Sequence, residues 1–290
     1  METKKLLFVT DFEKLWFDAL RSLSDLRDAE FGHVVFLNVI ERSRVSMYRG
    51  SGYKKSEEIR LREIANIRFI EWAEYLFEEG LEVGVYIAVG SLVQQVVSAV
   101  EKEGVDLIVM GHFKKGRLEQ FYSGSEVTEI IRRTSTPLLV FKYKSESGET
   151  YGKPFKKPLL AIDWLVSPID KITDYLMDFK DVIQEISIVH VARENEIKGD
   201  SIGEAQKIRK DFRRKLEEVC DLFEKNGIKA TPHLFVGDVM TEIEKAAREC
   251  RATMIITGSS GKGEWKEKWV GSLSGKLAAK SILPTLIIPA

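Results

Sequence analysis

The sequence predicts an α/β protein built from two repeated, doubly wound five-stranded parallel sheets with helices on both faces. The first observation is an internal repeat, because short motifs of the first half return in the second half. The second is that short β-branched apolar runs alternate with longer amphipathic stretches, as in βαβ units. The repeated motifs are LLFVTD and LLAID (6–11 and 159–163), VVFLNV and ISIVHV (34–39 and 186–191), and STPLLVF and ILPTLII (135–141 and 282–288).

The apolar runs and the helical spacing between them place the elements of the first copy. Gly80 stands where the longest helical stretch should stop, as expected of a helix-ending glycine. In chain order we expect strand 4–10, helix 13–25, strand 33–39, helix 56–79, strand 81–88, helix 91–103, strand 106–110, helix 125–134 and strand 137–142.

The second copy repeats this order, with Pro168 near a helix start and Gly227 after the longest helix. We expect strand 157–162, helix 168–179, strand 186–191, helix 201–226, strand 228–236, helix 238–250, strand 253–257, helix 272–281 and strand 284–288.

The distance between equivalent residues changes once along the chain. Asp11 lies 152 positions before Asp163, whereas Gly111 lies 147 positions before Gly258. The second copy is therefore five residues shorter, and we assign the difference to the stretch 41–56, interpreted as a surface loop.

A polar segment with several glycines separates the copies. We therefore expect domains at 1–144 and 155–290, joined by a linker at 145–154.

The composition excludes several classes of protein. The chain has 45 acidic and 44 basic residues, so it lacks the overall positive charge of a protein that binds duplex nucleic acid. Cys220 and Cys250 have no C-x-x-C or Cys/His cluster around them, which argues against a disulfide framework or a zinc site. The apolar run after Met1 stops at Asp11, too early for a signal peptide or membrane span, so the expected location is the cytoplasm.

A glycine motif in the second copy predicts a phosphate site. Gly258, Gly261 and Gly271 followed by Ser272 form the pattern G-x2-G-x9-G-S, after a predicted strand and before a predicted helix. The first two glycines allow the backbone to pass close to a phosphate, and the amides that open the helix attract an anion. Ser272 and Ser274 add hydroxyl donors.

With this motif in a duplicated α/β unit, the chain resembles a tandem universal stress protein, and the match covers nearly all of both copies. The resemblance implies strand order 3-2-1-4-5 and binding of ATP or another adenine nucleotide, as in many members of that family. Asp163 would contact the ribose or adenine, Val191 would offer its backbone to adenine, and Gly258, Gly261, Gly271, Ser272 and Ser274 match the phosphate-holding positions. The expected cofactor is ATP or AMP, with any Mg²⁺ held through the phosphates.

The first copy departs from this pattern. Lys114 replaces the second glycine, Val127 replaces the second serine, and Glu126 places negative charge at the helix start. We therefore expect a weakened or lost site there. Its second-rank candidate residues are Asp11, Val39, Gly111, Gly124 and Ser125.

Other functions are less well supported. Neither the P-loop pattern nor a G-x-G-x-x-G after a first strand is present. We interpret His190 as a hydrogen-bonded core residue, and we identify no nucleophile, base and orienting group together, so at most slow nucleotide hydrolysis is considered. The main alternative is an interaction scaffold with decayed sites that binds no nucleotide.

The last strand of each copy would be a sheet edge, and apolar edges invite pairing. By resemblance to the family homodimers, the two copies are expected to form a pseudo-dimer within the chain, and a further homodimer is an open expectation. No nucleic-acid or membrane partner is expected.

Overall fold

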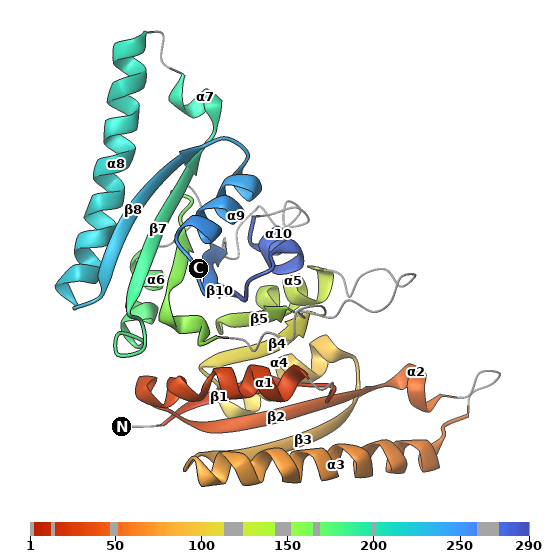
Figure 1. Cartoon of the computed structure of the whole chain (residues 1–290). Coiled ribbons are helices and arrows are strands. Elements are labelled where there is room, and N and C mark those ends of the chain that lie inside the picture. Colours follow the sequence, from red (N-terminus) through yellow and green to blue (C-terminus); the bar gives the residue numbers. More distant parts are fainter. Residues whose placement is uncertain are drawn as a thin grey trace. The chain divides into compact units, whose positions relative to one another are not determined.

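A computed structural model describes residues 3–12, 15–46, 52–112, 124–142, 152–164, 169–198, 201–259 and 273–289 (Figure 1). The chain divides into two compact units, Met1–Tyr143 and Lys144–Ala290, which we call copy one and copy two. The predicted linker 145–154 lies mostly outside the described residues, and its limits stay a prediction. Each copy is described by itself.

In copy one, the described strands form a parallel sheet in the order β3-β2-β1-β4-β5. The elements are β1 (Lys4–Val9), α1 (Leu15–Ser22), η1 (Ser24–Ala29), β2 (Phe31–Glu41), α2 (Arg42–Val45), α3 (Lys55–Glu78), β3 (Glu82–Gly90), α4 (Leu92–Glu103), β4 (Leu107–His112), α5 (Gly124–Arg133) and β5 (Leu138–Lys142).

Copy two repeats this topology, with its described parallel strands in the order β8-β7-β6-β9-β10. The elements are η2 (Pro154–Lys156), β6 (Pro158–Ala161), α6 (Ile169–Met177), β7 (Glu185–Ala192), α7 (Glu194–Ile197), α8 (Ile202–Lys225), β8 (Lys229–Val236), α9 (Val239–Glu249), β9 (Met254–Ser259), α10 (Leu273–Lys280) and β10 (Thr285–Pro289). The predicted fold and the strand order 3-2-1-4-5 are confirmed.

Successive side chains of a strand point to opposite faces, so a parallel sheet buries apolar side chains on both of its faces. On one face of copy one, the rings of Phe8 and Phe36 contact Trp72 of α3 at centroid distances of 6.2 and 5.6 Å. On the opposite face of copy two, Leu159 and Val189 belong to a core cluster that includes residues of α9 and α10.

The helix ends predicted at Gly80 and Gly227 are confirmed. Gly80 and Gly227 follow the two longest helices with φ of +73° and +86°, a conformation that costs glycine little. In copy two, the side chains of Ser201 and Asp238 accept hydrogen bonds from backbone amides in the first turns of α8 and α9, as helix-capping residues do.

The expectation of a loop at 41–56 is wrong at residues 42–45, which form α2, and α7 occupies the equivalent place in copy two. The five-residue difference lies after these short helices, because nine residues (46–54) precede α3 and four (198–201) precede α8. Val45 of α2 is fully buried with Ile40 and Leu61, and this packing fixes the short helix.

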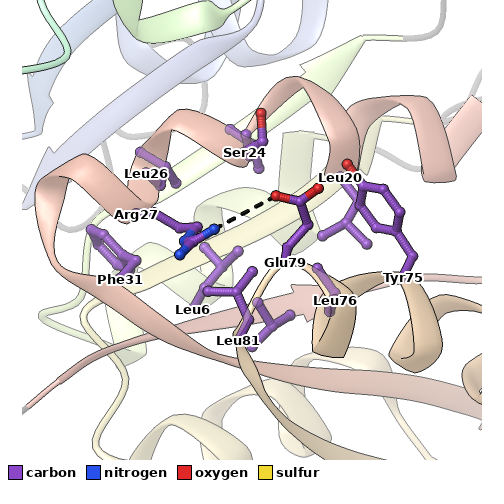
Figure 2. Close-up of a pocket in the computed structure, with 12 residues that line it drawn as sticks. Leu6, Leu20, Ser24, Leu26, Arg27, Phe31, Tyr75, Leu76, Glu79 and Leu81 are labelled. Carbon is purple, nitrogen blue, oxygen red and sulfur yellow. Dashed lines mark ion pairs between the residues drawn. The ribbon is translucent and has the colours of Figure 1, made fainter.

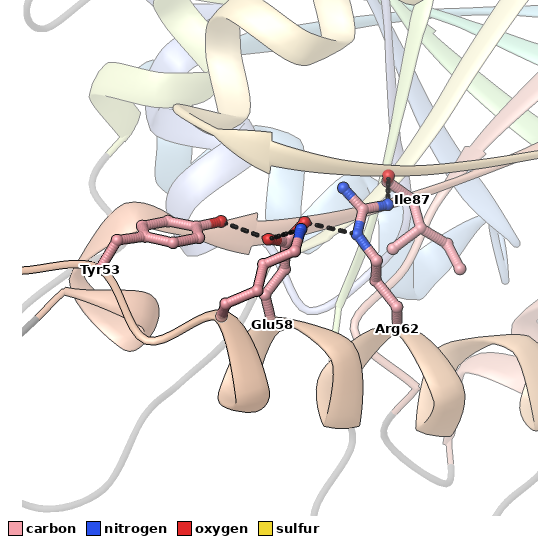
Figure 3. A network of polar contacts seen from close by, with 5 residues as sticks. Tyr53, Glu58, Arg62 and Ile87 are labelled. Atoms are coloured by element: carbon pink, nitrogen blue, oxygen red, sulfur yellow. Dashed lines mark hydrogen bonds and ion pairs between the residues drawn. The ribbon is translucent and has the colours of Figure 1, made fainter.

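A buried carboxylate joins the segment before α3 to the sheet (Figure 3). Glu58 accepts hydrogen bonds from Tyr53 Oη at 2.6 Å, Lys55 Nζ at 2.8 Å and Arg62 Nε at 2.7 Å. Arg62 also donates through Nη1 to the carbonyl oxygen of Ile87 in β3. These donors favour the ionised form and lower the pKa of Glu58 from 4.5 to about 2.

Candidate functional site

Three of the predicted site residues of copy two lie at the carboxyl ends of neighbouring strands. Asp163 follows β6, Val191 lies near the end of β7, and Gly258 lies near the end of β9. β6 is the central strand, and its Ala161 is in register with residues of both β7 and β9. The chain leaves β6 towards β7 on one side and reaches β9 on the other, so the three residues lie where the strand order reverses, the usual place for a ligand in such sheets.

Two residues of β7 hold the backbone just before Asp163. The amide of Ile162 donates to the carbonyl oxygen of Val189 at 2.8 Å, and Nδ1 of His190 lies 2.9 Å from the carbonyl oxygen of Ile162. Because a carbonyl only accepts, Nδ1 carries the proton in this contact. The prediction that His190 is a hydrogen-bonded core residue is confirmed, and its side chain is buried.

Copy one makes the same two contacts with a different side chain. The amide of Thr10 donates to the carbonyl oxygen of Leu37 at 3.0 Å, and Nδ2 of Asn38 donates to the carbonyl oxygen of Thr10 at 2.9 Å. Asn38 and His190 occupy equivalent positions, so both copies fix the strand end that precedes the aspartate.

Ser274 lies in the first turn of α10, and only 4% of its surface is exposed. The helix therefore turns this residue towards the body of copy two and not towards solvent. Gly261, Gly271 and Ser272 lie outside the described residues, so their placement stays a prediction.

Trp164 was not among the predicted site residues, although it directly follows Asp163. Its ring centroid lies 5.7 Å from that of His190, and Nζ of Lys215 in α8 lies 5.8 Å from the Trp164 ring. Within the described part of the chain, Trp164 Nε1 and His190 Nε2 are buried and have no hydrogen-bond partner. One feature of the sequence could have pointed to Trp164. It is an aromatic residue with a hydrogen-bond donor directly after Asp163, whereas the equivalent residue of copy one, Phe12, has no polar group.

In copy one, Asp11 and Val39 lie at the ends of β1 and β2, Gly111 lies in β4, and Gly124 and Ser125 open α5. These second-rank residues are therefore brought to the same end of the sheet as their counterparts in copy two.

The start of α5 differs in chemistry from the start of α10. Val127 occupies the position of Ser274 and is buried, so it provides no hydroxyl. Burial and, as the smaller cause, the negative charge of Glu41 at the end of β2 together raise the pKa of Glu126 to about 7. A phosphate at this helix start would meet two carboxylates, which supports the prediction of a weakened site. The proximity of Glu41 was missed because β2 ends two residues later than predicted.

Two cavities in the described residues lie at the opposite end of the sheets, near the amino ends of the strands. In copy one, a cavity of about 20 Å³ is lined by Leu6, Phe31 and Leu81 below an ion pair of Arg27 with Glu79, whose Nη1 and Oε2 are 3.6 Å apart (Figure 2). This volume holds about one water molecule.

In copy two, a space of about 310 Å³ adjoins Arg251 and Ile282, near the amino ends of β9 and β10. Neither cavity adjoins the predicted site residues.

Two further observations concern metal binding and membrane spans. The described side chains include no group of three or more His, Cys, Asp or Glu residues that could hold a metal ion. No helix among the described segments has both the length and the apolar character of a membrane span.

Comparisons with known proteins agree with this architecture. Residues 2–142 and 173–289 match the Universal stress protein family. The universal stress protein MJ0577 of Methanocaldococcus jannaschii is 30% identical over an alignment of 156 residues, and the match covers 49% of this chain and 96% of that protein. The universal stress protein YxiE of Bacillus subtilis is 28% identical over an alignment of 146 residues, and the match covers 46% of this chain and 99% of that protein.

A solved structure of a universal stress protein from Archaeoglobus fulgidus shares the fold along the whole chain. It has a TM-score of 0.73 and 21% identity, and the match covers 98% of this chain and 96% of that one.

Proposed function

The chain belongs to the universal stress protein family, and from this premise we propose that it is a regulatory protein that binds ATP or another adenine nucleotide, chiefly through copy two. The observation that carries the proposal is the meeting of Asp163, Val191 and Gly258 at adjacent strand ends, where the strand order reverses.

Each group has a distinct part in the proposed complex. The carboxylate of Asp163 accepts hydrogen bonds from ribose hydroxyls, and the backbone at Val191 pairs with the adenine edge. The phosphates lie between Gly258 and the start of α10, where backbone amides and the helix dipole favour negative charge by about 0.3–1 kcal/mol per exposed contact. Several such contacts are needed, and Gly261, Gly271, Ser272 and Ser274 supply them. Any Mg²⁺ is held through the phosphates.

Copy one contributes little to binding under this proposal. Val127 lacks the hydroxyl that Ser274 provides, and Glu126 and Glu41 oppose an incoming phosphate. The division of roles makes one occupied site per chain the expected state.

Calorimetric titration of the full chain with ATP, ADP and AMP tests the proposal. Gly261→Lys copies the residue of copy one, and we expect it to weaken nucleotide binding at least tenfold. Lys114→Arg in copy one is the matched control and should leave the affinity unchanged. Unchanged affinity of Gly261→Lys would refute the role of this glycine. Absence of binding by the wild type at millimolar nucleotide would select the alternative of a nucleotide-independent scaffold.

A further inference from the structure

Helix α3 carries an apolar surface that faces away from its own sheet. Figure 1 shows α3 running along β3 in copy one. The outer apolar residues expose between 44% and 60% of their surface. They are Ile59, Ile64, Ile67, Ile70 and Phe77, and we call them the α3 stripe.

The spacing of the stripe shows that it is a second apolar face. The face of α3 that packs on the sheet uses Leu61, Phe69 and Trp72, which are buried. With about 3.6 residues per turn, Ile59, Ile70 and Phe77 fall nearly in line on the side away from the sheet, Ile67 lies beside them, and Ile64 lies at the far edge of that side. Glu63 and Glu74 lie between these apolar residues. A surface helix needs one apolar face for its own domain, so the stripe requires another explanation.

The duplicated helix provides an internal control. α8 has the same length as α3 and the same place in the order of elements. At the five positions of the stripe, 147 residues further on, α8 carries only polar or charged residues. They are Gln206, Asp211, Arg214, Glu217 and Glu224. The fold therefore does not require apolar residues there, and the stripe is a property of copy one alone.

The charges around the stripe are divided along the helix. Residues 54–66 include four basic and three acidic side chains, whereas residues 67–79 include one basic and four acidic side chains. Two α3 helices side by side in parallel would place their acidic halves together. An antiparallel pair places the acidic half of each helix beside the more basic half of the other.

We propose that the α3 stripe is the interface of a homodimer, in which two α3 helices pack antiparallel about a twofold axis near Ile67 and Ile70. A twofold interface uses the same surface on both partners. Ile67 and Ile70 lie near the middle of α3, so a twofold axis there brings the stripe of one chain against the stripe of the other. One helix pair is a small interface, so the dimer dissociates at micromolar concentrations.

Sedimentation velocity of the full chain tests the interface. Ile67→Arg with Ile70→Glu copies the residues of α8, and we expect the variant to have roughly half the mass of the wild type at the same concentration, chosen well above that at which the wild-type dimer dissociates. Both residues are exposed, so circular dichroism should be unchanged. Arg214→Glu on α8 is the control and should dimerise like the wild type. A wild type that is monomeric, or a double variant with wild-type mass, overturns the proposal; the latter would favour pairing through sheet edges.

Disulfide trapping tests the antiparallel order. Ile67→Cys should form a covalent dimer on mild oxidation, beyond any formed by the wild type with its two native cysteines. Phe77→Cys alone should not, whereas a mixture of Phe77→Cys and Ile59→Cys should. Efficient dimerisation of Phe77→Cys with itself would indicate parallel helices and contradict the proposal.

Discussion

Nδ1 of His190 donates a hydrogen bond to the carbonyl oxygen of Ile162 across 2.9 Å, and this contact fixes the residue that precedes Asp163. In copy one, Asn38 holds the carbonyl oxygen of Thr10 in the same way. The same backbone position is therefore fixed in both copies, although the side chain has changed from an amide to an imidazole. In each copy, a buried side chain of the second strand therefore holds the backbone next to the candidate site.

Replacing His190 should lower both stability and nucleotide affinity. His190→Ala leaves the buried carbonyl oxygen of Ile162 without this donor, and such a loss costs about 1–3 kcal/mol. Urea denaturation of the full chain measures the loss in the free energy of unfolding. His190→Asn restores a donor of the kind found in copy one and should recover part of it.

The equivalent change in copy one separates structure from binding. Asn38→Ala should lower stability by a similar amount and leave calorimetric nucleotide affinity unchanged. If His190→Ala binds nucleotide as tightly as the wild type, the hydrogen bond does not position Asp163.

Glu126 should make stability fall as pH rises. Its pKa is about 7 in the folded chain against an ordinary value of 4.5, so the folded state retains a proton that the unfolded state releases between these values. Stability is therefore lost as pH increases from about 4.5 to 7. Glu126→Gln removes this effect, and its thermal midpoint should exceed that of the wild type more at pH 8 than at pH 5. An equal difference at both pH values would contradict the perturbed pKa.

Glu58 should have the opposite pH dependence. Its pKa is lowered from 4.5 to about 2, so its stabilising contribution is complete above pH 4.5 and is lost as the pH falls towards 2. Glu58→Gln should be less stable than the wild type at pH 7, and the difference should shrink below pH 4. Hydrogen exchange should increase around Val45 and Tyr53. The exposed neighbour change Glu63→Gln is the control, and equal effects of the two variants would exclude a special role for Glu58.

The strands and long helices could be predicted because each sheet is buried on both faces and each long helix has an apolar side. Leu6–Val9 of β1, Leu107–Met110 of β4 and Met254–Ile256 of β9 are uninterrupted apolar runs, so the pattern is present in both copies. The short helices α2 and α7 were not predicted, because four residues are too few to show helical spacing. They are held by tertiary packing, as the buried side chains of Val45 and Ile197 show.

The placement of the candidate site residues could be predicted in part. Asp163, Val191 and Gly258 could be placed together because parallel strands end at the same edge of a sheet. The contact of His190 with Ile162, the neighbouring Trp164 and the position of Glu41 depend on side-chain directions and on the length of β2, which no spacing rule supplies.

Restoring the motif in copy one should create a second site. The triple variant Lys114→Gly, Glu126→Leu and Val127→Ser gives copy one the residues of copy two at these positions. It removes one carboxylate and adds a hydroxyl donor at the start of α5. Calorimetry should show the stoichiometry rising from one nucleotide per chain towards two. A stoichiometry that stays at one would mean that other differences inactivate copy one.

Mass spectrometry of the intact chain under native conditions tests the central proposal most directly. With added ATP, the account predicts one nucleotide per wild-type chain, loss of that nucleotide in Asp163→Asn and its retention in Asp11→Asn. A wild-type chain that carries no nucleotide, or a nucleotide lost on substitution of Asp11 but kept on substitution of Asp163, would contradict binding through copy two.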